Sequence, residues 1–205
     1  MNKSFQKIYF DPYIFFSLFL LSTLGLFFLF SASNADVTIV SKQFVYVIAG
    51  FIIMILVSQL DPDIFRRMSG LFLFFALILL GITYLFGPEI NGAQRWVRVG
   101  PFSFQSSELL KLAVPIFLAN FLFDKKLPIQ KKEITISLLI IFSCFGFVFR
   151  QPDLGTGLII ACSGLFVLFL SGLSWSFIGG SFILLIISSP FIWNILLQPF
   201  QRQRI

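Results

Sequence analysis

Seven long apolar segments follow one another along this chain, and they restrict it to one broad class of fold. Each is close to the ~20 residues that an α-helix needs to cross the hydrocarbon core of a bilayer. The segments are Pro12–Ala32, Phe44–Leu60, Ser69–Phe86, Leu109–Phe123, Ile134–Phe149, Thr156–Leu173 and Ser176–Leu197. Hydrophobic residues make up 58% of the 205 residues and charged residues only 12%, which excludes an ordinary soluble domain. The sequence therefore predicts an all-α, polytopic membrane helix bundle, formed as a single integral membrane domain over residues 1–205.

The basic residues between these segments predict the orientation in the membrane. With a cytoplasmic N-terminus, eight lie inside: Lys3, Lys7, Arg66, Arg67, Lys125, Lys126, Lys131 and Lys132. Six then lie outside: Lys42, Arg95, Arg98, Arg150, Arg202 and Arg204. Most of the inner residues form pairs directly beside segment ends, where the positive-inside rule acts most strongly. We therefore expect the N-terminus inside and the polar stretch 91–111 outside.

The stretch 91–111 is unusual because it places two arginines, Arg95 and Arg98, on the outer side. Two interpretations fit them. In one, the arginines contact lipid headgroups or pair with a neighbouring carboxylate. In the other, they bind an anionic ligand such as a lipid phosphate, whose geometry suits the guanidinium fork.

Glu108 and Lys111 lie three residues apart at the predicted start of the fourth span. With Ser106 or Ser107 as the N-cap, both side chains lie on the same side of one helical turn and can pair. Pairing would offset the cost of holding a lysine within the membrane. The pair either fixes the depth of the span or belongs to a polar site that opens to the outer surface.

A second polar segment, 150–156, separates the fifth and sixth spans on the same predicted side. Pro152 should end the preceding helix, and Asp153 should cap the next one or present its carboxylate to solvent. Both outer loops thus combine arginine, glutamine and an acid, a set that suits a polyanionic, hydroxyl-rich ligand. The chain has no histidine, which excludes a histidine base and the commonest zinc ligand.

Three ordered motifs carry a resemblance to a known family: NGAQRW, FQSSELLKLAVP and RQPDLGTGLIIACSGLFVLFLSGLSW. Together they resemble the SEDS proteins (shape, elongation, division and sporulation), and most of all the RodA members. The final QPFQRQRI is similar to the family segment that opens a large outer loop. The chain differs from the usual Gln-Pro-Ser-Glu of the family, because it has Gln105-Ser106-Ser107-Glu108.

The resemblance implies an inverting glycosyltransferase that polymerises lipid II into glycan strands during cell elongation and rod-shape maintenance. It implies about ten spans and a catalytic aspartate beyond the seventh, so this chain resembles the N-terminal part, ending near Ile205 where the outer loop begins. Glu108 and Lys111 match residues of the central polar cavity, in supporting catalytic roles. Arg95, Trp96, Arg98, Gln105 and Asp153 are the expected substrate-binding residues.

The resemblance also implies a bacterial cytoplasmic membrane location, a site on the outer face, and work with a class B penicillin-binding protein and the elongation machinery. Mg²⁺ or Mn²⁺ would assist pyrophosphate departure, although no residue spacing defines a metal site. Two other functions compete. A lipid II flippase would also use intramembrane charges and proline-broken helices, but here the polar residues concentrate at one membrane edge. A non-catalytic scaffold of the elongation machinery is the other alternative.

Overall fold

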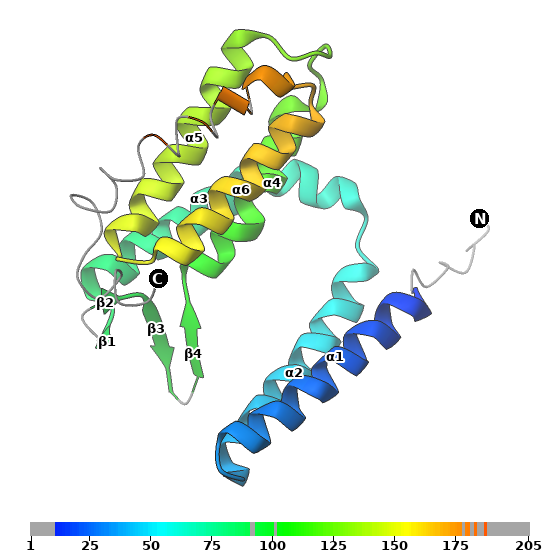
Figure 1. The fold of residues 1–205 in the computed structure, drawn as a ribbon, viewed down its shortest axis with the longest axis vertical. Coiled ribbons are helices and arrows are strands. Elements are labelled where there is room, and N and C mark those ends of the chain that lie inside the picture. Colours follow the sequence, from blue (N-terminus) through cyan, green and yellow to red (C-terminus); the bar gives the residue numbers. More distant parts are fainter. Residues whose placement is uncertain are drawn as a thin grey trace, which may run out of the picture. The chain divides into compact units, whose positions relative to one another are not determined.

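The computed structural model describes residues 11–90, 93–100, 102–177, 179–180, 183 and 187, and this part is mainly helical. The main helices are α1 (Pro12–Ala32), α2 (Val37–Ser58), α3 (Pro62–Phe86), α4 (Ser107–Phe123), α5 (Lys131–Arg150) and α6 (Leu154–Leu170). Within the described residues, α1, α2, α3 and α5 are long and apolar enough to cross a membrane. The predicted all-α, multi-pass membrane fold is therefore confirmed (Figure 1).

The predicted spans match the helices closely at their apolar centres but not at their ends. The first span has the predicted bounds, whereas α2 begins at Val37 rather than Phe44, because the Asp36 side chain accepts a hydrogen bond from Thr38 N at 2.8 Å and caps the helix earlier. Likewise α3 begins at Pro62, a favoured residue for the first helical turn. The seventh predicted span, Ser176–Leu197, lies almost entirely outside the described residues.

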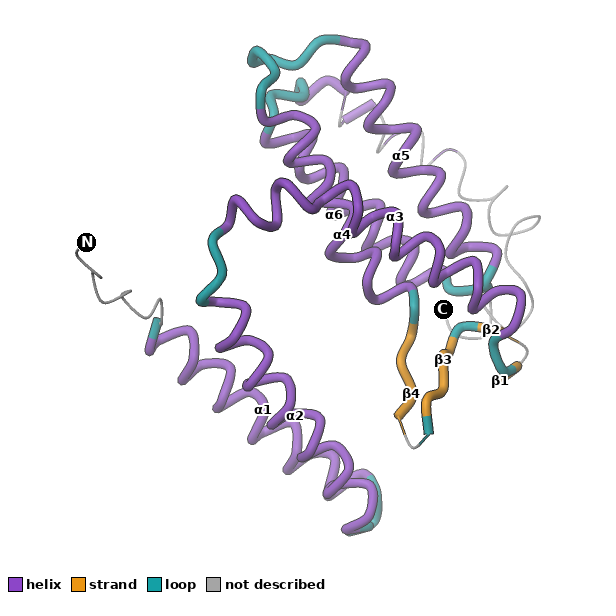
Figure 2. The backbone as a smooth tube through the Cα atoms, turned by 180° about the vertical axis from the view of Figure 1, so that it is seen from behind, coloured by secondary structure: helices purple, strands orange, loops and turns teal. Residues whose placement is uncertain are grey.

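Helices α1 and α2 form the first of two compact units, and they pair as an antiparallel hairpin (Figure 2). Asp11 caps α1 by accepting hydrogen bonds from Tyr13 N and Ile14 N at 2.9 and 3.2 Å. Neither helix contains a buried residue, although both are strongly apolar. A helix that is apolar on all faces and not buried within its own unit is suited to direct contact with the lipid chains of a bilayer.

The second unit, from Asp63 onward, holds the core. Helix α6 packs against both α4 and α5, with Leu118, Ile141 and Ile160 fully buried between them. Gly164 allows the close approach, because a Cβ atom there would lie 2.6 Å from Ile141 Cγ1. Side chains of α3, including the fully buried Ala76, complete the core.

Two short hairpins, which were not predicted from the sequence, follow α3 (Figure 1). Strand β1 (Glu89–Ile90) pairs with β2 (Ala93–Gln94), and β3 (Trp96–Val99) pairs with β4 (Phe102–Gln105), both antiparallel. Gly100, with φ of 60°, lies in the turn between β3 and β4. An open two-stranded sheet has unpaired edge groups that need water, so these hairpins mark the membrane surface.

The connections of the second unit gather at two opposite ends. At one end, Ile129 N of the α4–α5 loop donates to Ser171 O, which follows α6, at 3.4 Å. At the other end, the hairpins lead directly into α4, and the α5–α6 turn lies beside them (Figures 1 and 2). The two polar segments singled out in the sequence therefore meet at one membrane surface.

Candidate functional site

Arg95 joins the two polar loops. Its Nε donates to the carbonyl oxygen of Gln151 at 2.8 Å, and its Nη2 donates to the carbonyl oxygen of Pro152, also at 2.8 Å. The turn supplies these acceptors because α5 ends at Arg150 and Pro152 cannot continue the helix. A planar guanidinium with two parallel donors suits such a pair of carbonyls. Arg95 thus fixes the α5–α6 turn against the hairpin that precedes α4.

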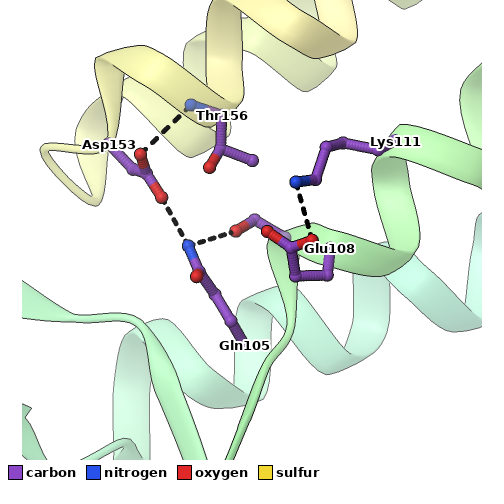
Figure 3. A network of polar contacts seen from close by, with 6 residues as sticks. Gln105, Glu108, Lys111, Asp153 and Thr156 are labelled. Atoms are coloured by element: carbon purple, nitrogen blue, oxygen red, sulfur yellow. Dashed lines mark hydrogen bonds and ion pairs between the residues drawn. The ribbon is translucent and has the colours of Figure 1, made fainter. Parts of the chain in front are cut away.

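Gln105 forms a second link between the loops (Figure 3). Its Nε2 donates to Asp153 Oδ2 and to Ser107 Oγ, the latter at 3.0 Å. The other carboxylate oxygen, Asp153 Oδ1, accepts from Thr156 N at 3.2 Å and caps α6. The predicted capping role of Asp153 is confirmed, and both of its oxygens are engaged. Asp153 therefore joins the two loops in addition to capping α6.

Glu108 and Lys111 pair next to this network, as Figure 3 shows. Lys111 Nζ lies 2.6 Å from Glu108 Oε2, and the side chains are 25% and 44% exposed, respectively. The predicted pair is confirmed. Glu108 lies in the first turn of α4, where the positive end of the helix favours an acid. Lys111 has three N–H donors, so it can hold Glu108 and still donate to a ligand.

The start of α4 differs from the expected capping in one respect. Ser106 occupies the N-cap position, as expected, but its side chain makes no capping hydrogen bond. Its hydroxyl oxygen is buried and has no hydrogen-bond partner among the described residues. The Ser106 backbone has φ of −61° and ψ of −34°, already helical, which keeps the hydroxyl from reaching the free N–H groups of the first turn.

Trp96 and Arg98 lie on β3, and the register determines their neighbours. Trp96 pairs with Gln105, and Arg98 pairs with Ser103. Arg98 is exposed and makes no ion pair within the described part of the chain, whereas Arg95 is partly buried. From the sequence, the same two interpretations applied to both arginines. In the structure, Arg95 joins the two loops, whereas Arg98 faces solvent.

Gln151 also belongs to this site, although it was not among the expected substrate-binding residues. It is 2% exposed, and its Nε2 donates to Leu80 O of α3 at 3.2 Å. Its own carbonyl accepts from Arg95. Gln151 therefore ties α3 to the turn, and only its place in a polar segment between two apolar runs signalled a special role.

The described residues contain no group of three or more cysteine, aspartate, glutamate or histidine side chains that could hold a metal ion. The two acids near the centre of the site have protein partners: Glu108 contacts Lys111 through Oε2, and Asp153 accepts from Gln105 and Thr156 N. These residues do not fit a divalent-cation site on their own.

The fold and the site define a class: a multi-pass membrane helix bundle with a mixed-charge, hydrogen-bonded site where two loops meet at one membrane surface. Comparison with known proteins narrows this class. A family model described as cell cycle protein, covering FtsW, RodA and SpoVE, matches residues 11–205. The chain belongs to the FtsW/RodA/SpoVE family.

Curated relatives agree with this assignment. The chain is 36% identical to the peptidoglycan glycosyltransferase MrdB of Escherichia coli K12, over 100% of the chain and 55% of that protein. It is 33% identical to the stage V sporulation protein E of Bacillus subtilis, over 91% of the chain and 54% of that protein. The chain thus spans about half the length of these relatives.

Solved structures show the same fold. The rod shape determining protein RodA of Thermus thermophilus is similar with a TM-score of 0.78 and 27% identity, over 88% of this chain and 60% of that one. A chain from a peptidoglycan synthase complex, solved to explain how polymerization and crosslinking are coordinated, gives a TM-score of 0.82 and 28% identity. That match covers 95% of this chain and 57% of the other.

Proposed function

We propose that this chain carries part of the membrane site of a peptidoglycan glycosyltransferase that polymerises lipid II during cell elongation. The observation that carries the proposal is the meeting of the two polar loops around the Glu108–Lys111 pair, at one membrane surface, in a chain of this family. A lipid-linked donor has its reactive pyrophosphate and sugar at this level of the bilayer, which makes the position suitable for the chemistry.

The reaction passes a sugar from an undecaprenyl pyrophosphate donor to the 4-hydroxyl of an acceptor sugar, with inversion. The departing pyrophosphate gains negative charge, and cationic donors held in place beforehand stabilise it most effectively. Lys111 supplies such a donor, since Glu108 occupies only one of its N–H groups at 2.6 Å. Lys111 is therefore assigned to the pyrophosphate, and Glu108 to holding Lys111 in position.

The proton of the acceptor hydroxyl needs a base. Asp153 does not suit this role, because Gln105 and Thr156 N already occupy its two oxygens. Glu108 lies 2.6 Å from Lys111 Nζ through its Oε2 atom, so its proposed role is to position the lysine. The role proposed for the described residues of this chain is therefore to bind and position the donor.

The remaining site residues act mainly through position. Arg95 and Gln105 hold the two loops together, so their substitution would displace the Glu108–Lys111 pair from its ligand. Arg98 is exposed and free to contact a phosphate or a headgroup, and Trp96, opposite Gln105 on the hairpin, offers an aromatic surface to a sugar.

This proposal requires the β3–β4 hairpin to lie outside the bacterial cytoplasmic membrane, with the N-terminus inside. Ser103 on β4 is exposed and suits a single-cysteine label after Cys144 and Cys162 are replaced by alanine. Ser103→Cys should react with a membrane-impermeant maleimide added to intact cells. Protection in intact cells, with labelling only after lysis, would reverse the orientation and remove the substrate from the site.

The similarity to a chain of a peptidoglycan synthase complex supports a partner that crosslinks the strands, of the class B penicillin-binding type. The activity itself is tested with the polypeptide purified from its native membranes and reconstituted in vesicles with labelled lipid II. Gel-resolved glycan strands from lipid II in the accessible leaflet support a polymerase. Movement of lipid II between leaflets without strand formation would support the flippase instead. If neither strand formation nor movement is observed, the scaffold role is the one that remains.

A further inference from the structure

A groove beside the polar site runs along the second unit between α3 and α5. Its volume is about 460 Å³, and apolar and aromatic side chains line most of it: Phe74, Leu77, Ile78, Tyr84, Leu85 and Phe147. Gly81 is among the residues that line the groove, and Arg150 and Gln151 line it at the end of α5. The groove is thus apolar along its length and cationic at one end.

The dimensions of this groove match one leaflet of a bilayer. The α3 residues that line it extend from Phe74 to Leu85. At 1.5 Å per residue this length is ~16 Å, close to half of the ~30 Å hydrocarbon core. The polar end lies at the last residues of α5, beside the hairpins that mark the membrane surface. A lipid chain entering from that surface would end near the bilayer centre.

The residues at the polar end favour an anionic headgroup. Arg150 is exposed in the last turn of α5 and forms no ion pair within the described residues. Tyr84, 47% exposed, lines the same groove in the last turn of α3, in the interfacial position that tyrosine favours. Arg150 can therefore hold a phosphate at the depth where lipid phosphates lie.

We propose that this groove is a binding site for an anionic glycerophospholipid, with one acyl chain between α3 and α5 and the phosphate at Arg150. The proposal is independent of the glycosyltransferase reaction, because none of the groove-lining residues belongs to the proposed catalytic pair. Bound lipid would fill the space between α3 and α5 next to Gln151, which ties α3 to the α5–α6 turn. The lipid would thereby stabilise the helix that supports the site.

Gly81 provides a variant that blocks the groove without disturbing the fold. A Cβ atom added at Gly81 meets nothing within 4 Å, so Gly81→Leu should be accommodated while its side chain fills the groove. Gly146 on α5 is the matched control, because a Cβ atom there also meets nothing and Gly146 does not line the groove. Leucine also favours a helix more than glycine does, so both variants should keep the wild-type melting temperature or exceed it.

The test is native mass spectrometry of the purified polypeptide, delipidated and then titrated with phosphatidylglycerol or phosphatidylcholine of the same acyl chains. We expect each chain to retain one phosphatidylglycerol and to bind it about fivefold more tightly than phosphatidylcholine. This is the gain in affinity that one basic residue near an anionic headgroup gives. Arg150→Gln should abolish the preference. Gly81→Leu should abolish the retained lipid, and Gly146→Leu should not.

Three results would overturn the proposal. Retention unchanged in Gly81→Leu would place the lipid elsewhere. Equal loss in Gly81→Leu and Gly146→Leu would indicate a general lipid annulus rather than a site. Displacement of phosphatidylglycerol by undecaprenyl phosphate at equal concentration would assign the groove to the isoprenoid carrier. A failure of the glycosyltransferase assay would affect none of these measurements, so the two proposals are tested separately.

Discussion

The clearest energetic prediction concerns Arg95, because its two hydrogen bonds connect segments that are far apart in sequence. Both bonds are 2.8 Å long, and the acceptor at Gln151 belongs to a residue that is 2% exposed. A hydrogen bond from a charged group contributes about 1.5–3 kcal/mol, and Arg95 is only partly buried, so the lower figure applies. Arg95→Met should therefore lower the free energy of unfolding by about 3 kcal/mol, since two such bonds are lost.

Two further variants test this reasoning. One separates the contribution of the planar guanidinium from that of its positive charge, and the other is a control at an exposed arginine. Arg95→Lys keeps the charge but presents one compact donor group, so it should recover about half of the loss. Arg98→Met, three residues further along and within β3, removes an exposed arginine and should change stability by less than about 0.5 kcal/mol.

The measurement is equilibrium unfolding in mixed micelles with increasing sodium dodecyl sulfate, followed by the fluorescence of the three tryptophans. A loss at Arg95 no greater than the loss at Arg98 would refute the reasoning that Arg95 joins the loops. Full recovery in Arg95→Lys would show that charge alone, without the guanidinium fork, supplies the stability.

Three other stability predictions follow from the same structure, each measured by unfolding as above. Asp153→Ala removes a helix cap and a link between loops and should cost about 2 kcal/mol, while Asp153→Asn keeps an acceptor and should cost less than half of that; equal losses would contradict the capping role. Ser106→Pro should stabilise by about 0.5–1 kcal/mol, because φ is already −61° and the buried hydroxyl has no partner among the described residues; destabilisation would show that the Ser106 N–H or hydroxyl is needed. Gly164→Ala should cost about 1–3 kcal/mol by forcing a methyl group against Ile141, whereas Gly146→Ala should not destabilise; equal effects would mean that α5 and α6 do not pack closely at Gly164.

Much of the fold could be predicted from the sequence because a bilayer requires long apolar helices, and these are visible as runs of residues. Their polar ends were less predictable. Helix α2 extends back to Val37 because the carboxylate of Asp36 accepts from the N–H of Thr38 in the first turn, and hydropathy does not register such a cap. The alternation of Trp96-Val97-Arg98-Val99 before a Gly-Pro pair is a hairpin signal, which the strong apolar runs on either side obscured.

The site was predictable in its components but not in its connections. The spacing of Glu108 and Lys111 on one helix predicts their pairing, since three residues bring two side chains to one face. No local pattern predicts that Gln105 meets Asp153 or that Arg95 meets the carbonyls of Gln151 and Pro152. These contacts span 48 to 57 residues and depend on how α4, α5 and α6 pack.

The measurement that tests the central claim most directly is the rate of glycan-strand formation from lipid II by the polypeptide purified from its native membranes. Lys111→Met and Glu108→Gln are compared with Lys132→Met, which removes an exposed lysine at the far end of α5. Losing one preorganised donor to a leaving group costs about 10²–10³ in rate, so Lys111→Met should fall by this factor and Glu108→Gln by less. Lys132→Met should retain the wild-type rate. Wild-type rates in Lys111→Met and Glu108→Gln, at matched protein amounts, would contradict the claim and leave the pair as an anchor that sets the depth of α4.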